Sequence, residues 1–148
     1  MNYWFECKVS YERQADSMGM KKVSESYLVD ALSFTEAEKR IIKEIRPFVS
    51  VGELEVVNIR RARIAELFLS DEGEDDRYFR AKVNFITVDE KSGSEKKTSA
   101  TMIVKSDSLP NAVTELKAQL DSQMASYEIA AVTDTQILDV FQYEAPEK

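Results

Sequence analysis

The sequence predicts an α+β fold in which a ββαββ unit occurs twice, giving a mainly antiparallel sheet with two helices packed on it. Three observations lead to this prediction. Apolar residues alternate with polar ones in two long segments, a capped helical pattern follows each segment, and the whole order recurs after 73 to 75 residues. We therefore expect one domain over residues 1–148, made of repeats at 1–70 and 77–143, with an acidic linker at 70–77 and a frayed tail at 144–148.

The recurrence is best seen in the phase of the elements. Lys8-Val9 matches Lys82-Val83 at a spacing of 74, and Ser24 matches Ser99 at 75. After the predicted helix, Glu55 matches Glu128 at 73. Such agreement in element type and hydrophobic phase indicates a duplication, although the sequence leaves open whether the two repeats share one sheet.

The first strand of each repeat has an apolar face and a polar face, which is typical of an antiparallel sheet covered on one side. Each strand is predicted to form a hairpin with the next one, at 20–30 and at 96–105, through polar turns at 14–19 and 89–95. The apolar faces are Phe5, Cys7, Val9 and Tyr11 in the first repeat, and Phe79, Ala81, Val83 and Phe85 in the second.

A helix is predicted after each hairpin. Ser33 and Glu36 form a capping box at the first helix, and Pro47 ends it. Ser108 is the expected N-cap of the second helix, with Pro110 in its first turn. The predicted apolar stripes are Ala37, Ile41, Ile42 and Ile45 in the first helix, and Leu109, Ala112, Val113, Leu116, Leu120 and Met124 in the second.

Two further apolar strands are expected to close each repeat as a hairpin. In the first repeat they lie at 54–59 and 63–69, with Arg60-Arg61 as the turn. In the second they lie at 127–132 and 136–141, with Thr133-Asp134 as the turn.

Composition excludes several classes of chemistry. The chain has no histidine and a single cysteine, Cys7, so Ser-His triads, Cys-His dyads, most zinc sites and an internal disulfide are ruled out. Its N-terminus does not resemble a signal peptide, and no apolar run is long enough to span a membrane. We expect a soluble, cytoplasmic protein without a membrane partner, a metal or a cofactor.

Charge is distributed unevenly along the chain. The net charge of -7 comes entirely from residues 71–148, because residues 1–70 hold 11 basic and 11 acidic side chains. The global charge argues against duplex binding, while a basic site in the first repeat stays possible.

The candidate binding residues are the basic side chains of the first repeat. Arginine side chains match the geometry of phosphate oxygens, so this group could bind a phosphate or an acidic partner. The same charges could instead protect an edge strand from pairing with another chain. The group consists of Arg40, Lys43 and Arg46 on the predicted helix, with Arg60, Arg61 and Arg63 at the following turn.

Two pairs of carboxylates also recur between the repeats. Glu55 matches Glu128, and Glu66 matches Asp139. Such pairs could share a proton or hold a divalent cation if they were close together, or each could face solvent or a basic side chain across the strand. The lysines that recur on the polar face, such as Lys22 and its counterpart Lys97, could form a solvated surface or a positive stripe.

Several segments together resemble a known family. The resemblance rests on Trp-Phe-Glu-Cys-Lys-Val at 4–9, the segment at 21–31, Ser-Phe-Thr-Glu-Ala-Glu at 33–38, and the segment at 84–93. They are similar to an uncharacterised family, a domain of unknown function found in gut-type bacteria and their phages. The resemblance covers nearly the whole chain and implies a phage or mobile-element context, but it supplies no catalytic residues.

The functional expectation is a non-catalytic binding or adaptor protein, acting on a protein partner or by self-association. One alternative is nucleic-acid or nucleotide-phosphate binding through the first-repeat arginines. Another alternative is a metal-dependent enzyme built on the duplicated carboxylates. Cys7 is not expected to be a nucleophile, because the chain offers no histidine to activate it.

Overall fold

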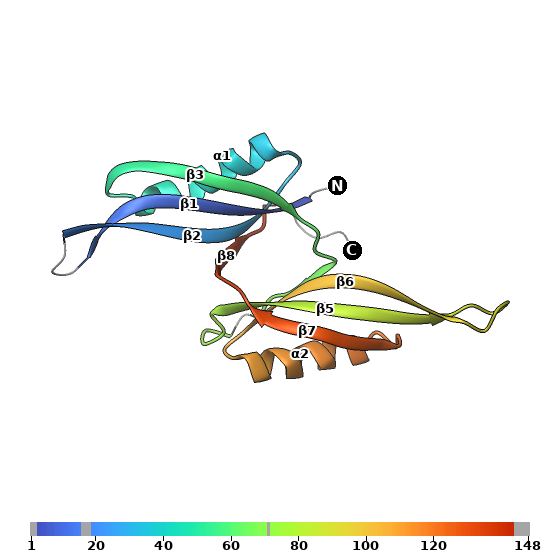
Figure 1. Ribbon diagram of the computed structural model, residues 1–148. Helices are drawn as coiled ribbons and strands as arrows, with labels where there is room; N and C mark the ends of the chain where they lie inside the picture. The colour runs from blue at the N-terminus through green and yellow to red at the C-terminus, as the bar shows by residue number, and fades with distance from the viewer. Residues whose placement is uncertain (1–2, 16–18, 71, 144–148) are drawn as a thin grey trace. The chain divides into compact units, whose positions relative to one another are not determined.

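The computed structural model describes residues 3–15, 19–70 and 72–143, and it confirms the α+β class. Two helices and eight strands follow one another in the order ββαββ twice, with one short 3-10 helix after the first α-helix (Figure 1). The first repeat holds β1 (Tyr3–Ala15), β2 (Gly19–Ala31), α1 (Phe34–Ile45), η1 (Arg46–Phe48), β3 (Val51–Ala62) and β4 (Glu66–Phe68). The second holds β5 (Arg77–Val88), β6 (Glu95–Ser106), α2 (Leu109–Asp121), β7 (Tyr127–Asp134) and β8 (Ile137–Phe141).

The strands form two separate four-stranded sheets, in the orders β3-β1-β2-β8 and β4-β6-β5-β7. The chain accordingly divides into two compact units. Unit 1 comprises Met1–Arg63 and Gln136–Lys148, and unit 2 comprises Ile64–Thr135. Each unit therefore takes one edge strand, β8 or β4, from the other sequence repeat.

The predicted closing hairpins are therefore wrong. The segments 54–59 and 63–69 do not pair with each other, and neither do the segments 127–132 and 136–141. Strand β3 pairs with β1, while β4 runs parallel to β6 and β8 runs parallel to β2. Arg60-Arg61 is not a turn, because β3 continues through it to Ala62. Two-residue hairpin loops require residues that tolerate positive φ, such as Asn-Gly, and neither Arg-Arg nor Thr-Asp supplies them.

The first two strands of each repeat form the hairpins that the alternation predicts. Strand β1 pairs with β2 along its full length, from Tyr3 opposite Ala31 to Ala15 opposite Gly19, and β5 pairs with β6 in the same way. The turn predicted at 89–95 lies between β5 and β6. The turn predicted at 14–19 falls partly on residues 16–18, which lie outside the described part of the chain, as does the predicted tail at 144–148.

Both helices begin where the sequence predicts. Ser33 Oγ accepts a hydrogen bond from the Glu36 amide at 3.2 Å, and the Glu36 carboxylate accepts one from the Leu32 amide at 2.9 Å. Ser108 Oγ accepts the Asn111 amide at 3.3 Å. Two residues of the predicted apolar stripe do not join the core. Leu109 is exposed at the first position of α2, and Met124 lies beyond the end of α2 with a φ of 57° and is exposed.

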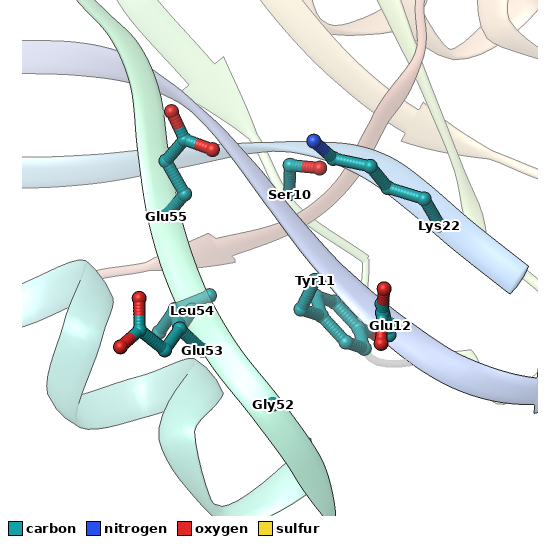
Figure 2. Close-up of a pocket in the computed structure, with 8 residues that line it drawn as sticks. All are labelled: Ser10, Tyr11, Glu12, Lys22, Gly52, Glu53, Leu54 and Glu55. Carbon is teal, nitrogen blue, oxygen red and sulfur yellow. The ribbon is translucent and has the colours of Figure 1, made fainter. Parts of the chain in front are cut away.

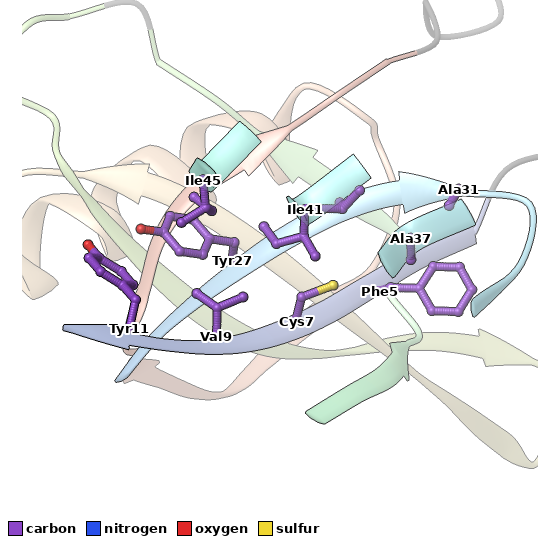
Figure 3. Close-up of a cluster of buried hydrophobic side chains, with 10 residues drawn as sticks. Phe5, Cys7, Val9, Tyr11, Tyr27, Ala31, Ala37, Ile41 and Ile45 are labelled. Carbon is purple, nitrogen blue, oxygen red and sulfur yellow. The ribbon is translucent and has the colours of Figure 1, made fainter. Parts of the chain in front are cut away.

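The core of unit 1 lies between α1 and the β1–β2 hairpin (Figure 3). Apolar side chains of β1 face the helix in a row, and Ala37, Ile41 and Ile45 meet them from α1. Unit 2 repeats this arrangement with Ala112, Leu116 and Leu120 of α2. Burying a large aliphatic side chain of this kind stabilises a fold by about 2 kcal/mol. Each helix is therefore anchored to the apolar face of its sheet, and the other face of the sheet is the polar one.

Candidate functional site

A pocket of about 420 Å³ opens in unit 1 between β1 and β3 (Figure 2). It is lined by Ser10, Tyr11 and Glu12 of β1, Lys22 of β2, and the segment Gly52–Glu55 of β3. Its volume falls within the range of roughly 300 to 1,000 Å³ that is common for small-molecule sites.

The pocket exists because the β1–β3 ladder is interrupted at this point. Ser10 lies opposite Glu55, while Glu12 lies opposite Val51. One residue of β1 therefore faces three residues of β3, which bulge away from the sheet. Gly52 in this bulge has a φ of 80°, a conformation that residues with a side chain rarely adopt.

Ser10 is the most informative residue in the pocket. Its side chain is only 2 % exposed, and its Oγ has no hydrogen-bond partner among the described residues. Leaving a buried hydroxyl unsatisfied costs about 1–3 kcal/mol. The alternation predicted Ser10 on a polar, solvated face, and its burial is a departure from that prediction.

The charges around Ser10 are predominantly negative. Three carboxylates line the pocket, from Glu12, Glu53 and Glu55, against one ammonium group, from Lys22. Figure 2 shows Ser10 on the central strand between Glu55 on one neighbouring strand and Lys22 on the other. A ligand here is therefore favoured if it carries positive charge or N–H donors.

Unit 2 contains a counterpart of this site that is closed by its own side chains. Asn84 lies opposite Ser99 and Glu128, in the same register in which Ser10 lies opposite Ser24 and Glu55. The Asn84 amide nitrogen donates to Glu128 at 3.2 Å, and the Asn84 oxygen accepts from Ser99 at 2.8 Å.

A lysine completes the unit 2 network. Lys97 Nζ lies 3.0 Å from the Glu128 carboxylate, and this contact, followed by the Asn84 hydrogen bond, lowers the pKa of Glu128. We call Asn84, Ser99, Lys97 and Glu128 the closed quartet, and Ser10, Ser24, Lys22 and Glu55 the open quartet. Among the described residues, no hydrogen bond or ion pair that the structure shows joins the members of the open quartet.

Tyr11 lines the pocket, and its side chain is held by a hydrogen bond. Its hydroxyl donates to Glu25 at 2.6 Å, and the Tyr27 hydroxyl donates to the same carboxylate at 3.0 Å. Burial, followed by the hydrogen bond to Glu25, raises the pKa of Tyr11 to about 12. The phenol therefore stays protonated at neutral pH and is a poor general base.

The predicted basic residues do not converge on one site. Arg60 lies opposite Glu6 on the polar face of the sheet and forms an ion pair with it at 3.1 Å. Arg40 lies on α1, where it contacts the Asp30 carboxylate at 3.4 Å and the Glu36 carboxylate at 3.1 Å. These two arginines are therefore held by different carboxylates, Arg60 on β3 by Glu6 and Arg40 on α1 by Asp30 and Glu36.

The remaining basic residues have no common target either. The Arg61 guanidinium stacks over the Tyr3 ring at 3.8 Å. Lys43 and Arg46 are exposed at the C-terminal end of α1, and Arg63 is exposed beyond the end of β3. Nucleic-acid or phosphate binding by this group stays a prediction.

The duplicated carboxylates behave differently from one another. Glu128 belongs to the closed quartet and Glu55 to the open one. Glu66 in β4 accepts a hydrogen bond from Gln123 at 3.2 Å. Within residues 3–15, 19–70 and 72–143, no three acidic or cysteine side chains are grouped so that they could hold a metal ion.

Cys7 is fully buried in the core of unit 1. Burial, followed by the charge of Glu6, raises the pKa of its thiol to about 12. The thiolate that a nucleophile requires is therefore almost absent at neutral pH.

Comparisons with known proteins identify a family but no function. A family model described as "Domain of unknown function (DUF4494)" matches residues 3–143. Neither the curated proteins nor the solved structures gave a match. In the part of the chain that the structure describes, no helix has the length and apolar character needed to cross a membrane.

Proposed function

Since the chain belongs to this family of unknown function, we propose from the geometry that it is a non-catalytic binding protein whose ligand site is the pocket around Ser10. The observation that carries the proposal is the buried Ser10 hydroxyl, which lines a pocket and lacks a hydrogen-bond partner among the described residues. Native structures rarely leave a buried polar atom unsatisfied, and a bound ligand is one way to satisfy it.

The counterpart in unit 2 supports this proposal. In the sheet of unit 2, the residue at the position of Ser10 is Asn84, and its side chain forms hydrogen bonds with Glu128 and Ser99. The open quartet is therefore not an unavoidable consequence of the fold. It reflects the shorter side chain of Ser10 and the bulge at Gly52–Leu54.

The chemistry of the pocket argues for binding rather than catalysis. Catalytic carboxylates usually lie in a desolvated site, whereas the three carboxylates here belong to exposed residues. The nearby phenol is held in its protonated form, and the chain has no histidine. A protein partner, a cytoplasmic location and a phage or mobile-element origin are further parts of this proposal, carried over from the sequence.

Fragment mapping by nuclear magnetic resonance tests the proposed site. A panel of formamide, methylammonium, guanidinium, acetate and phosphate is titrated into the full chain, and backbone amide shifts are followed. We expect the largest shifts at Ser10–Glu12 and Gly52–Glu55, with smaller shifts at Asn84 and Glu128. The phosphate arm also tests the basic residues, because it would shift Arg60 and Arg61 if they formed an anion site.

The result that contradicts the proposal is equally specific. If the fragments shift both quartets alike, or shift unit 2 more strongly, the Ser10 pocket is not a preferred binding site. Ser10→Asn serves as the matched control, because it installs the residue that unit 2 already carries at this register position. This variant should suppress the shifts at Gly52–Glu55 while leaving those elsewhere unchanged.

A further inference from the structure

The closed quartet indicates which chemical group the open quartet would bind. In unit 2 a carboxamide, that of Asn84, bridges two side chains by donating an N–H to Glu128 and accepting from Ser99. Glu55 and Ser24 occupy the corresponding register positions on either side of Ser10. A carboxamide brought by a ligand could therefore donate to Glu55 and accept from Ser24, completing the bridge that Ser10 is too short to form.

The charge of the pocket adds a second requirement. Two further carboxylates, from Glu12 and Glu53, line the pocket beyond Glu55, whereas Lys22 supplies the one basic side chain that the described residues place in its lining. In unit 2 the corresponding lysine, Lys97, forms an ion pair with Glu128. The surplus of negative charge favours a cationic group on the same ligand and disfavours a free carboxylate.

We propose that the Ser10 pocket binds a small, positively charged amide whose cationic group faces Glu12 and Glu53. Its carboxamide extends from Glu55 in the pocket lining over Ser10 towards Ser24, which lies on β2 just outside the lining. This inference rests on the proposed function and makes it more specific. The pocket volume of about 420 Å³ accommodates a molecule of the size of an amino-acid amide. Ser10, buried beneath the carboxamide, would gain the hydrogen-bond partner that it lacks among the described residues.

The test compares three probes that differ in one group. L-lysinamide carries both the carboxamide and two ammonium groups. Cadaverine is lysinamide without the carboxamide, and L-lysine replaces the carboxamide by a carboxylate. We expect calorimetric titration of the full chain to show lysinamide binding at least about tenfold more tightly than either control. A tenfold difference in affinity corresponds to the contribution of about one hydrogen bond to a charged group.

Variants locate the binding in the chain. Ser10→Asn should weaken lysinamide binding at least about tenfold, because its own carboxamide would occupy the ligand position. Asn84→Ser is the matched control and should leave the affinity of unit 1 unchanged. If Ser10→Asn fails to fold, Glu55→Gln carries the same test, since it removes the charged acceptor from an exposed position on β3.

The outcomes separate this inference from the proposed function. If cadaverine binds as tightly as lysinamide and both are lost in Ser10→Asn, the pocket binds cations without recognising an amide, and only the present inference fails. If none of the probes binds, or if Ser10→Asn leaves the affinity for lysinamide unchanged, the inference is overturned. The proposed function is then tested by the fragment mapping alone. An acetylated tripeptide amide with a central lysine distinguishes the two sources of such a group, a free metabolite and a partner protein chain.

Discussion

At the residue scale, the unit 1 core and the pocket meet at Tyr11. Its ring belongs to the buried cluster beneath α1, while its hydroxyl reaches Glu25 and its backbone lies at the interruption of the β1–β3 ladder. The buried phenol and its hydrogen bond to a carboxylate favour the protonated form. Tyr11 therefore couples the stability of unit 1 to pH in the alkaline range.

The contribution of Tyr11 to stability depends on pH in the alkaline range. The pKa of this phenol is about 10 in an unfolded chain and about 12 in the native one. The native state holds the proton more tightly, so this contribution to stability is complete below about pH 10 and is lost as the pH rises towards 12. Tyr11→Phe should lower the free energy of unfolding by about 1.5 kcal/mol at neutral pH through loss of the hydrogen bond to Glu25.

The measurement is urea unfolding of the wild type and Tyr11→Phe between about pH 8 and pH 12. The difference in stability between the two proteins should stay constant up to about pH 10 and shrink above it. A difference that keeps its neutral value at the highest pH would show that the phenol is not stabilised in its protonated form.

The open and closed quartets also show what residue-level sequence reading misses. Pairing Ser24 with Ser99 and Glu55 with Glu128 by spacing was sufficient to place these residues at matching register positions, and the sheets bear this out. The same spacing of 74 that aligns Lys8 with Lys82 aligns Ser10 with Asn84. That difference was the available signal, but its meaning depends on which hydrogen bonds form and on the bulge in β3, which the sequence does not specify.

At the element scale, caps and apolar stripes made the helices predictable. Ser33 and Ser108 begin α1 and α2, and the buried residues recur at the expected helical spacing. Local interactions determine these features, so a local pattern is enough to find them. The partner of a strand is a non-local choice, which is why β4 and β8 were assigned to the wrong neighbours.

The two caps allow a paired prediction. Ser33→Ala and Ser108→Ala should each lower the stability of the unit that carries the substitution by about 1 kcal/mol, because each removes the acceptor for an amide in the first turn. Hydrogen exchange resolved by residue would show the loss in α1 or α2 respectively. Ser33→Asp should restore α1, since aspartate is also a good N-cap; equal destabilisation by alanine and aspartate would contradict the capping role.

At the scale of the whole molecule, each unit is completed by a strand from the other sequence repeat. Strand β8 lies at the end of the second repeat, yet it pairs with β2 from Ser26 opposite Ile137 to Val29 opposite Phe141. Strand β4 lies at the end of the first repeat and pairs with β6. A sequence repeat is therefore not a folding unit, and expressing residues 1–70 alone would leave the first sheet without its fourth strand.

The contacts of β8 show what unit 1 would lose without this strand. Ile137 is buried, and the Phe141 ring stacks on Tyr27 with 5.6 Å between ring centroids. The Tyr143 amide donates to the Asp30 carboxylate at 2.8 Å, and the Tyr143 hydroxyl donates to Glu44. Removing two packed apolar side chains and a part-buried hydrogen bond is expected to cost more than about 3 kcal/mol.

A chain truncated after Thr135 should therefore lose stability in unit 1 and retain it in unit 2. Hydrogen exchange would show this as faster exchange at Leu28 and Val29 on β2, while Ile103 and Val104 on β6 keep their protection. A chain truncated after Tyr143 is the matched control, because it keeps all of β8. Adding a synthetic peptide of residues 136–143 to the shorter chain should restore protection of β2, since the strand would pair in trans as it does within the chain. If the shorter chain protects β2 as well as the control does, β8 is dispensable and the exchange of strands does not hold unit 1 together.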